Sequence, residues 1–145
     1  MSTKRDYKMG RFDVEFEVAN EEDILDARRG MIKEDQVRRV ILKGVVDCGA
    51  TRLVLPGTVV EKLGLPSSDR IRVRYANNET AVRDAVKGVY VKLLGRDGVF
   101  TAAVVPKRRS ALIGAIVLED LDFLVDCTGQ KLVPRDPRFV VSELE

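Results

Sequence analysis

The chain of 145 residues contains no histidine. This absence excludes Ser-His and Cys-His nucleophile pairs, histidine-based zinc sites and histidine proton shuttles. If the protein is a hydrolase, carboxylates and water are therefore the expected means of catalysis. One general arrangement of this kind has two carboxylates that share a proton, one of which activates a water molecule as a base.

Tryptophan is also absent, and aromatic residues make up only 6% of the chain, so the core must be built from Val, Leu and Ile. Two cysteines offer neither a disulfide framework nor a zinc site, and we expect no metal or other cofactor. The formal net charge of +2 is too small to indicate a polyanionic partner. No apolar run reaches membrane-spanning length, and residues 1–11 lack the hydrophobic region of a signal peptide. We therefore expect a soluble cytoplasmic protein without a membrane partner.

With 45% apolar and 33% charged residues, the composition is typical of a globular protein. The length predicts one domain over residues 10–145, preceded by a flexible N-terminus at residues 1–9. Alternating apolar and polar residues predict strands at residues 12–18, 71–75 and 80–86. Further strands are expected at residues 37–46, 89–94, 99–105, 123–126 and 131–133. Short helices are expected at residues 58–63 and 116–121, and a loop or a single helical turn at residues 20–29. Many short strands at this spacing predict an all-β barrel with one or two short helices.

Two hairpins are expected among these strands. Asn77-Asn78 separates the strands at 71–75 and 80–86, and asparagine tolerates left-handed turn geometry. Arg96-Asp97-Gly98 separates the strands at 89–94 and 99–105, and its Asp-Gly pair predicts a turn there.

The most informative segment is Val45-Val46-Asp47-Cys48-Gly49-Ala50-Thr51. Here a carboxylate stands at the end of an apolar β-branched run and is followed closely by a glycine. This arrangement lets Asp47 sit on a tight turn where backbone amides can approach its carboxylate. Because Asp-x-Gly is common in turns of no catalytic role, an ordinary turn aspartate is the alternative interpretation.

Three segments, in this order along the chain, resemble the retropepsin-like (clan AA) aspartic proteases. Residues 47–50 resemble the family's active-site motif, Asp-Thr/Ser-Gly-Ala. Residues 73–80 lie where the family carries its flap hairpin, and Ala111-Leu112-Ile113-Gly114-Ala115 resembles the hydrophobic residues and glycine before its short helix. The closer likeness is to small single-domain members found outside viruses, which end in a pattern like Leu124-Val125-Asp126 with Leu132-Val133-Pro134.

The resemblance implies a retropepsin-like acid-protease barrel that works as a homodimer and hydrolyses peptide bonds in a peptide or protein substrate. Since the chain has one such motif, two subunits would each supply one Asp47. One ionised carboxylate would activate a water molecule, and the protonated mate would polarise the scissile carbonyl. The residues implied to bind substrate are Gly49, Ala50, Tyr75, Ala76, Asn77 and Asn78.

Cys48 departs from the family motif, which has Thr or Ser at this position with a hydroxyl that bonds across the dimer. A thiol is a weaker donor and acceptor, so this brace between subunits should be looser. A nucleophilic role for Cys48 is not expected, because no histidine is present to generate a thiolate. The alternative function is a retropepsin-fold peptide-binding or dimerisation module with weak or no catalysis.

Two further interpretations are weaker. Residues 124–129 resemble the Asp47 segment, which suggests a second catalytic aspartate at Asp126 in a monomeric enzyme. A hairpin turn at Asp126 is favoured instead, because the glycine of this segment is displaced by one residue.

A nucleic-acid-binding surface is suggested by three basic clusters, Lys107-Arg108-Arg109, Lys4-Arg5 and Arg38-Arg39. Without clustered aromatics or excess charge, a solvated loop is favoured and nucleic acid is not expected as a partner.

Overall fold

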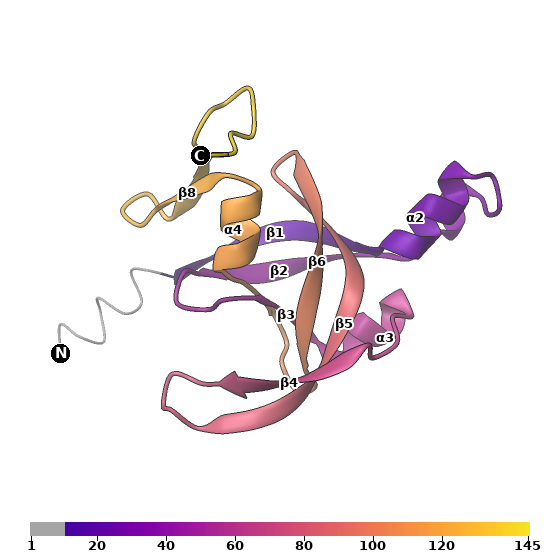
Figure 1. Ribbon diagram of the computed structural model, residues 1–145, viewed down its shortest axis with the longest axis horizontal. Coiled ribbons are helices and arrows are strands. Elements are labelled where there is room, and N and C mark those ends of the chain that lie inside the picture. Colours follow the sequence, from indigo (N-terminus) through magenta and orange to yellow (C-terminus); the bar gives the residue numbers. More distant parts are fainter. Residues whose placement is uncertain (1–10) are drawn as a thin grey trace.

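The protein is built mainly of β-strands (Figure 1), and the computed structural model describes residues 11–145. The expected flexible segment at residues 1–9 lies outside the described residues. The strands are β1 (Arg11–Asn20), β2 (Arg39–Asp47), β3 (Leu53–Pro56), β4 (Asp69–Arg74), β5 (Thr80–Leu93), β6 (Arg96–Val105), β7 (Ala111–Ile113), β8 (Phe123–Asp126) and β9 (Lys131–Pro134).

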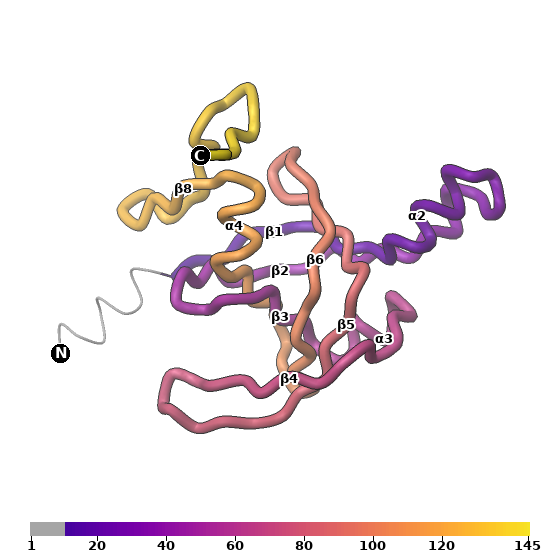
Figure 2. Tube along the Cα trace, in the orientation of Figure 1, coloured from indigo at the N-terminus to yellow at the C-terminus, as the bar shows by residue number. Residues whose placement is uncertain are grey.

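Six of these strands close into a barrel in the order β1-β2-β7-β3-β6-β5, and β5 pairs back to β1. Strand β4 extends the sheet beyond β5, and β8 and β9 form a separate two-stranded sheet. The chain trace in Figure 2 shows the β4–β5 hairpin reaching past the barrel on the side of β3. The all-β barrel predicted from the sequence is confirmed.

The helices are short: α2 (Glu21–Arg28), the 3-10 turn η1 (Glu34–Gln36), α3 (Gly57–Leu63) and α4 (Ala115–Asp120). Helix α2 has eight residues, where the sequence predicted a loop or a single turn. Helix α3 ends as predicted at Gly64, whose φ of +67° is the left-handed conformation that glycine adopts without strain. Within residues 11–145, no helix combines the length and apolar character needed to cross a membrane.

Alternation along the strands places their apolar residues inside the barrel. In β1, Phe12, Phe16 and Val18 are buried, whereas Asp13 and Glu15 are exposed. The largest fully buried side chains are Leu53, Leu55, Leu63, Leu93, Ile113, Leu121, Val18, Val46, Val86, Val89, Val91 and Val117. All of them are aliphatic, so the core rests on Val, Leu and Ile as the composition predicted.

Strand β5 is continuous, whereas the sequence predicted separate strands at residues 80–86 and 89–94. Its pairing with β6 changes register between Val86 and Val89, and Gly88 has a φ of +74°. The break in alternation is therefore a β-bulge inside one strand. The bulge lets β5 pair with β4 before it and with β1 after it.

The turn between β5 and β6 lies at Leu94-Gly95. The prediction of a turn at Arg96-Asp97-Gly98 is therefore wrong. Leu94 and Gly95 have φ values of +48° and +84°, the geometry of a tight two-residue hairpin turn. Residues 96–98 lie within β6 and pair with β5. The Tyr90 hydroxyl donates a hydrogen bond to Asp97 Oδ2 at 2.9 Å, so this aspartate bridges neighbouring strands instead of forming the turn.

Asn20 joins helices α2 and α3. Its side chain is buried, and its Oδ1 accepts a hydrogen bond from Asp23 N at 3.1 Å, which caps α2. Its Nδ2 donates to the Leu63 carbonyl at the end of α3 at 2.8 Å. Because both ends of the amide are satisfied, this polar side chain is accommodated in the interior.

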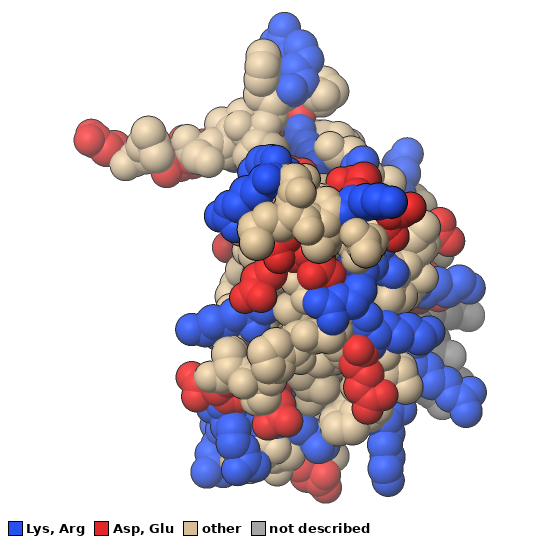
Figure 3. Space-filling view, turned by 90° about the vertical axis from the view of Figure 1, so that its right-hand side faces the viewer, with Lys and Arg blue, Asp and Glu red and all other residues tan. Residues whose placement is uncertain are grey.

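Basic and acidic side chains are intermixed on the face shown in Figure 3. Arg38 donates from Nε to Asp23 at 2.8 Å, and this contact holds the pKa of Asp23 below its ordinary value. Arg39 forms ion pairs with Glu17 and Glu34. The basic pair noted in the sequence is therefore bound to carboxylates of the same chain.

Asn20→Ala is expected to lower the free energy of unfolding by about 2–3 kcal/mol, because α2 loses its cap and the Leu63 carbonyl loses a buried donor. Asn20→Ser keeps a capping oxygen without the amide donor and should lose roughly half as much. Urea unfolding of the wild type and both variants measures these losses. Equal losses for Ala and Ser would show that the cap contributes nothing.

Candidate active site

Asp47 is the last residue of β2, and the chain turns immediately after it. Its Oδ1 accepts a hydrogen bond from Gly49 N at 3.0 Å, and its carbonyl accepts one from Ala50 N at 3.1 Å. Arg11, its partner in the β1–β2 register, places a guanidinium nitrogen 3.4 Å from Oδ2. The Asp47 side chain is 23% exposed. The carboxylate is thus held in position while solvent still reaches it.

The loop after Asp47 packs directly against Gly114. Strands β2 and β7 are parallel, with Val46 opposite Ile113, which brings Gly114 beside this loop. A Cβ atom on Gly114 would lie 2.6 Å from the Arg52 carbonyl oxygen and 2.7 Å from that of Ala50. Such contacts with backbone cannot be relieved by a side-chain rotation, so only glycine permits this approach.

The first amides of α4 fasten the same loop. Ala115 N donates to the Ala50 carbonyl at 2.8 Å, and Ile116 N donates to the Thr51 carbonyl at 2.9 Å. Amides at a helix start have no acceptor within the helix, and here the loop supplies acceptors. The glycine-containing segment and the aspartate loop, which are distant in sequence, therefore form one site.

Cys48 follows Asp47 and is an exposed free cysteine, as is Cys127. Partial burial of the thiol, followed by the negative charges that Cys127 and Asp47 can carry nearby, raises the pKa of Cys48 above its ordinary value. The thiol is therefore protonated at neutral pH and is a poor nucleophile. This agrees with the expectation that Cys48 is not the attacking group.

Asp126 forms a turn between β8 and β9. Its Oδ1 accepts a hydrogen bond from Gly129 N at 2.9 Å, and it pairs with Lys131 across the hairpin. The favoured interpretation of this repeat as a strand-to-turn element is confirmed.

The hairpin predicted around Asn77-Asn78 is also confirmed. Asn78 has a φ of +68°, and its amide donates to the Tyr75 carbonyl at 2.9 Å. Arg83 Nε donates to the Tyr75 hydroxyl across the hairpin at 3.1 Å. Tyr75, Ala76, Asn77 and Asn78 are all exposed at its tip, and their contact with substrate stays a prediction.

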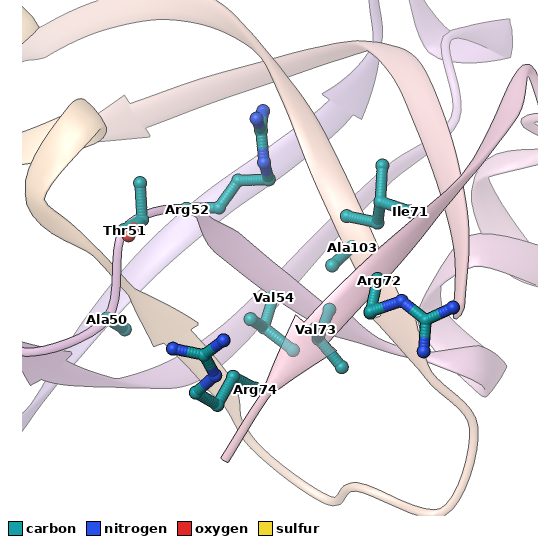
Figure 4. Close-up of a pocket in the computed structure, with 9 residues that line it drawn as sticks. All are labelled: Ala50, Thr51, Arg52, Val54, Ile71, Arg72, Val73, Arg74 and Ala103. Atoms are coloured by element: carbon teal, nitrogen blue, oxygen red, sulfur yellow. The ribbon is translucent and has the colours of Figure 1, made fainter. Parts of the chain in front are cut away.

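A cavity of about 210 Å³ lies between the Asp47 loop and β4 (Figure 4). It is lined by Ala50, Thr51, Arg52, Val54, Ile71, Arg72, Val73, Arg74 and Ala103. Of the residues predicted to bind substrate, only Ala50 lines it; Gly49 and the hairpin tip do not. Asp47 itself lies outside the lining, three residues before Ala50.

The lining residues of β4 were not predicted from the sequence. Residues 70–74 read Arg-Ile-Arg-Val-Arg, a strict alternation of basic and apolar residues. This period of two separates Ile71 and Val73 from the arginines on the two faces of a strand. The alternation was the available signal, but it did not reveal which element the apolar face meets.

The residues that the structure describes contain no cluster of three or more Cys, Asp or Glu side chains suited to a metal ion. Residues 30–117 match the model of an aspartyl protease family. The matched range contains the Asp47 loop, the β4–β5 hairpin and Gly114. A comparison with curated proteins gives no match.

Gly114→Ala is expected to destabilise the protein by about 1–3 kcal/mol, because the new methyl group overlaps backbone atoms of the Asp47 loop. Gly44→Ala is the matched comparison, since its Cβ would meet side-chain atoms of Phe16 and Ile113, at 2.7 and 2.8 Å. Phe16 and Ile113 are buried, but side chains can repack where backbone atoms cannot, so the Gly44 variant should lose less. Thermal and urea unfolding measure both, and an unchanged Gly114→Ala protein would refute the close-approach argument.

Proposed function

Since the chain belongs to the aspartyl protease family matched by its residues 30–117, we propose that it is a homodimeric aspartic endopeptidase. The observation that carries this proposal is the placement of Asp47: a solvent-accessible carboxylate at a strand end, held by the Gly49 amide. Its loop is fastened by Ala115 and Ile116 at the start of α4. This rigid placement suits a carboxylate that must hold water in a fixed position.

The reaction uses two Asp47 side chains, one from each subunit. The ionised carboxylate removes a proton from the water between them, and the water oxygen bonds to the scissile carbonyl carbon. The protonated carboxyl of the other subunit donates a hydrogen bond to the carbonyl oxygen as negative charge develops there. The tetrahedral intermediate then breaks its carbon–nitrogen bond, and the leaving amine takes up a proton from the pair.

The homodimer follows from the number of suitable carboxylates. A shared-proton pair needs two carboxylates close together, with like charges that prevent both from ionising easily. Asp126, the second aspartate in a similar sequence, is used in the β8–β9 turn. A two-fold axis that brings two Asp47 loops together supplies the pair with one copy of the motif per chain.

An extended peptide is the substrate that fits this arrangement. Strand β4 ends the order of the main sheet, with β5 as its only strand partner among residues 11–145. Its free edge can pair with an extended peptide through backbone hydrogen bonds. Gly49 and Ala50 form one side of the binding cleft, and the hairpin tip at residues 75–78 closes over the peptide from the other.

A second candidate function is a peptide-binding or dimerisation module without catalysis. Cys48 favours it, because a protonated thiol stands where the family motif has a hydroxyl. In that case the same cleft binds a peptide, and the pair of Asp47 carboxylates does not hydrolyse it.

Asp47→Asn is expected to abolish cleavage of an unfolded protein substrate while leaving folding and dimerisation intact, because the amide keeps the shape of the side chain and removes the base. Asp126→Asn is the matched control: its amide oxygen can still accept from Gly129, so cleavage should persist. Cleavage should also decline as pH rises, because the mechanism needs one proton on the carboxylate pair. Product formation measured from about pH 3 to pH 7 covers the working range of such pairs.

Equal cleavage by the wild type and Asp47→Asn would refute the mechanism. Absence of cleavage by the wild type at every pH would instead support the module without catalysis.

Cys48→Thr is expected to strengthen the dimer, because a hydroxyl pair across the axis forms better hydrogen bonds than two thiols, each bond being worth about 1 kcal/mol. The dissociation constant should fall by up to roughly 5-fold for each such bond. Sedimentation equilibrium of both proteins over a range of concentrations measures it. A wild type that stays monomeric throughout would contradict the homodimer, and a looser Thr variant would contradict the bracing argument.

A further inference from the structure

The cavity beside the Asp47 loop combines an apolar interior with an arginine-rich rim. We propose that it selects peptides in which an apolar side chain is flanked by acidic residues. The proposal rests on the proposed function in that the same cleft receives the peptide, and it adds the chemical class of the substrate.

The interior of the cavity is aliphatic. Val54 on β3 and Ala103 on β6 are register partners, and they face Ile71 and Val73 of β4 across the cavity. In Figure 4 the side chains of Val54 and Val73 lie next to each other. An apolar cavity of about 150 Å³ holds a benzene molecule. The volume of about 210 Å³ found here therefore accepts one aliphatic or aromatic side chain.

The rim carries Arg52, Arg72 and Arg74. Within residues 11–145, none of these three guanidinium groups has a hydrogen-bond or ion-pair partner. Arg70 on the same strand differs, because it lies 3.9 Å from Asp84 and does not line the cavity. The rim therefore holds positive charge that the surrounding chain leaves uncompensated.

The positions of these charges suit a peptide with carboxylates on either side of the apolar residue. In Figure 4 the Arg74 guanidinium lies on the Ala50 side of Val54, and that of Arg72 lies beyond Val73 in the opposite direction. An exposed ion pair typically changes affinity by about 1.5- to 5-fold and is screened by salt. Two such pairs are enough for a clear preference without tight binding.

Nucleic acid fits this surface less well than an acidic peptide. Proteins that bind single strands stack the bases on aromatic side chains. None of the nine residues that line the cavity is aromatic. The interior instead offers aliphatic surface to a single buried side chain.

Binding is measured on Asp47→Asn protein, so that cleavage cannot consume the probe and the result does not depend on turnover. The probes are fluorescently labelled peptides with a central Leu flanked on both sides by Glu, Gln or Lys. At neutral pH and low salt, the Glu peptide is expected to bind about 3- to 10-fold more tightly than the Gln peptide and the Lys peptide more weakly than either. High salt should remove most of the difference.

Arg72→Gln and Arg74→Gln, each added to Asp47→Asn, should lower the preference for Glu over Gln by about 1.5- to 5-fold. Arg70→Gln, the control on the same strand, should leave it unchanged. A charged side chain in place of the central Leu should weaken binding of the Glu peptide, since it cannot enter the aliphatic interior.

Equal binding of the three peptides, binding of none, or an equal effect of Arg70→Gln would overturn the proposal. An oligothymidylate that binds more tightly than the Glu peptide would also overturn it, in favour of a nucleic-acid surface. A Glu preference together with a wild type that cleaves nothing would support this specificity and refute the peptidase.

Discussion

The approach of Gly114 to the backbone of residues 50–52 is the constraint on which the site depends. Parallel pairing of β2 with β7 brings the two segments to the same end of the barrel. A side chain at this position would separate them, and the amides of Ala115 and Ile116 would lose their carbonyl acceptors. Because Ala50 also lines the neighbouring cavity, the absence of a side chain at Gly114 sets the position of the carboxylate and of one wall of that cavity.

The local elements of the fold were largely predictable from sequence, whereas their connections were not. The alternation in β1, the glycine that ends α3 and the asparagine turn at Asn78 each depend on neighbouring residues, and the sequence predicts all three. The turn at Leu94-Gly95 was missed because the Asp97-Gly98 pair is a stronger local turn signal. The pairing of β5 with β6, and with β1 far away in sequence, fixes the register and places the turn at Leu94-Gly95 instead.

The residues of the candidate site also divide into those that local sequence signals reveal and those that only the fold brings together. Asp47, its glycine turn and the Gly114 segment were identified from short motifs, because each needs particular residue types at fixed spacing. The cavity was not, because its walls come from β3, β4 and β6, and any strand with alternating residues has an apolar face. Only the fold shows that the face of β4 carrying Ile71 and Val73 is turned toward Val54 and Ala103 of the barrel rather than toward solvent.

The β4–β5 hairpin is anchored at one end only. Strand β5 begins to pair with β6 at Ala85, and residues 80–84 have β4 as their strand partner. The outer half of the hairpin therefore shares no ladder hydrogen bond with the closed barrel. Pairs of residues can therefore be inserted into or removed from this outer half without changing the strand register of the barrel. Its exposed side chains can also be exchanged without changing the barrel core. Barrel stability and the charge at the cavity rim can accordingly diverge independently, the first in the buried aliphatic residues and the second in Arg72 and Arg74, two exposed positions of the hairpin.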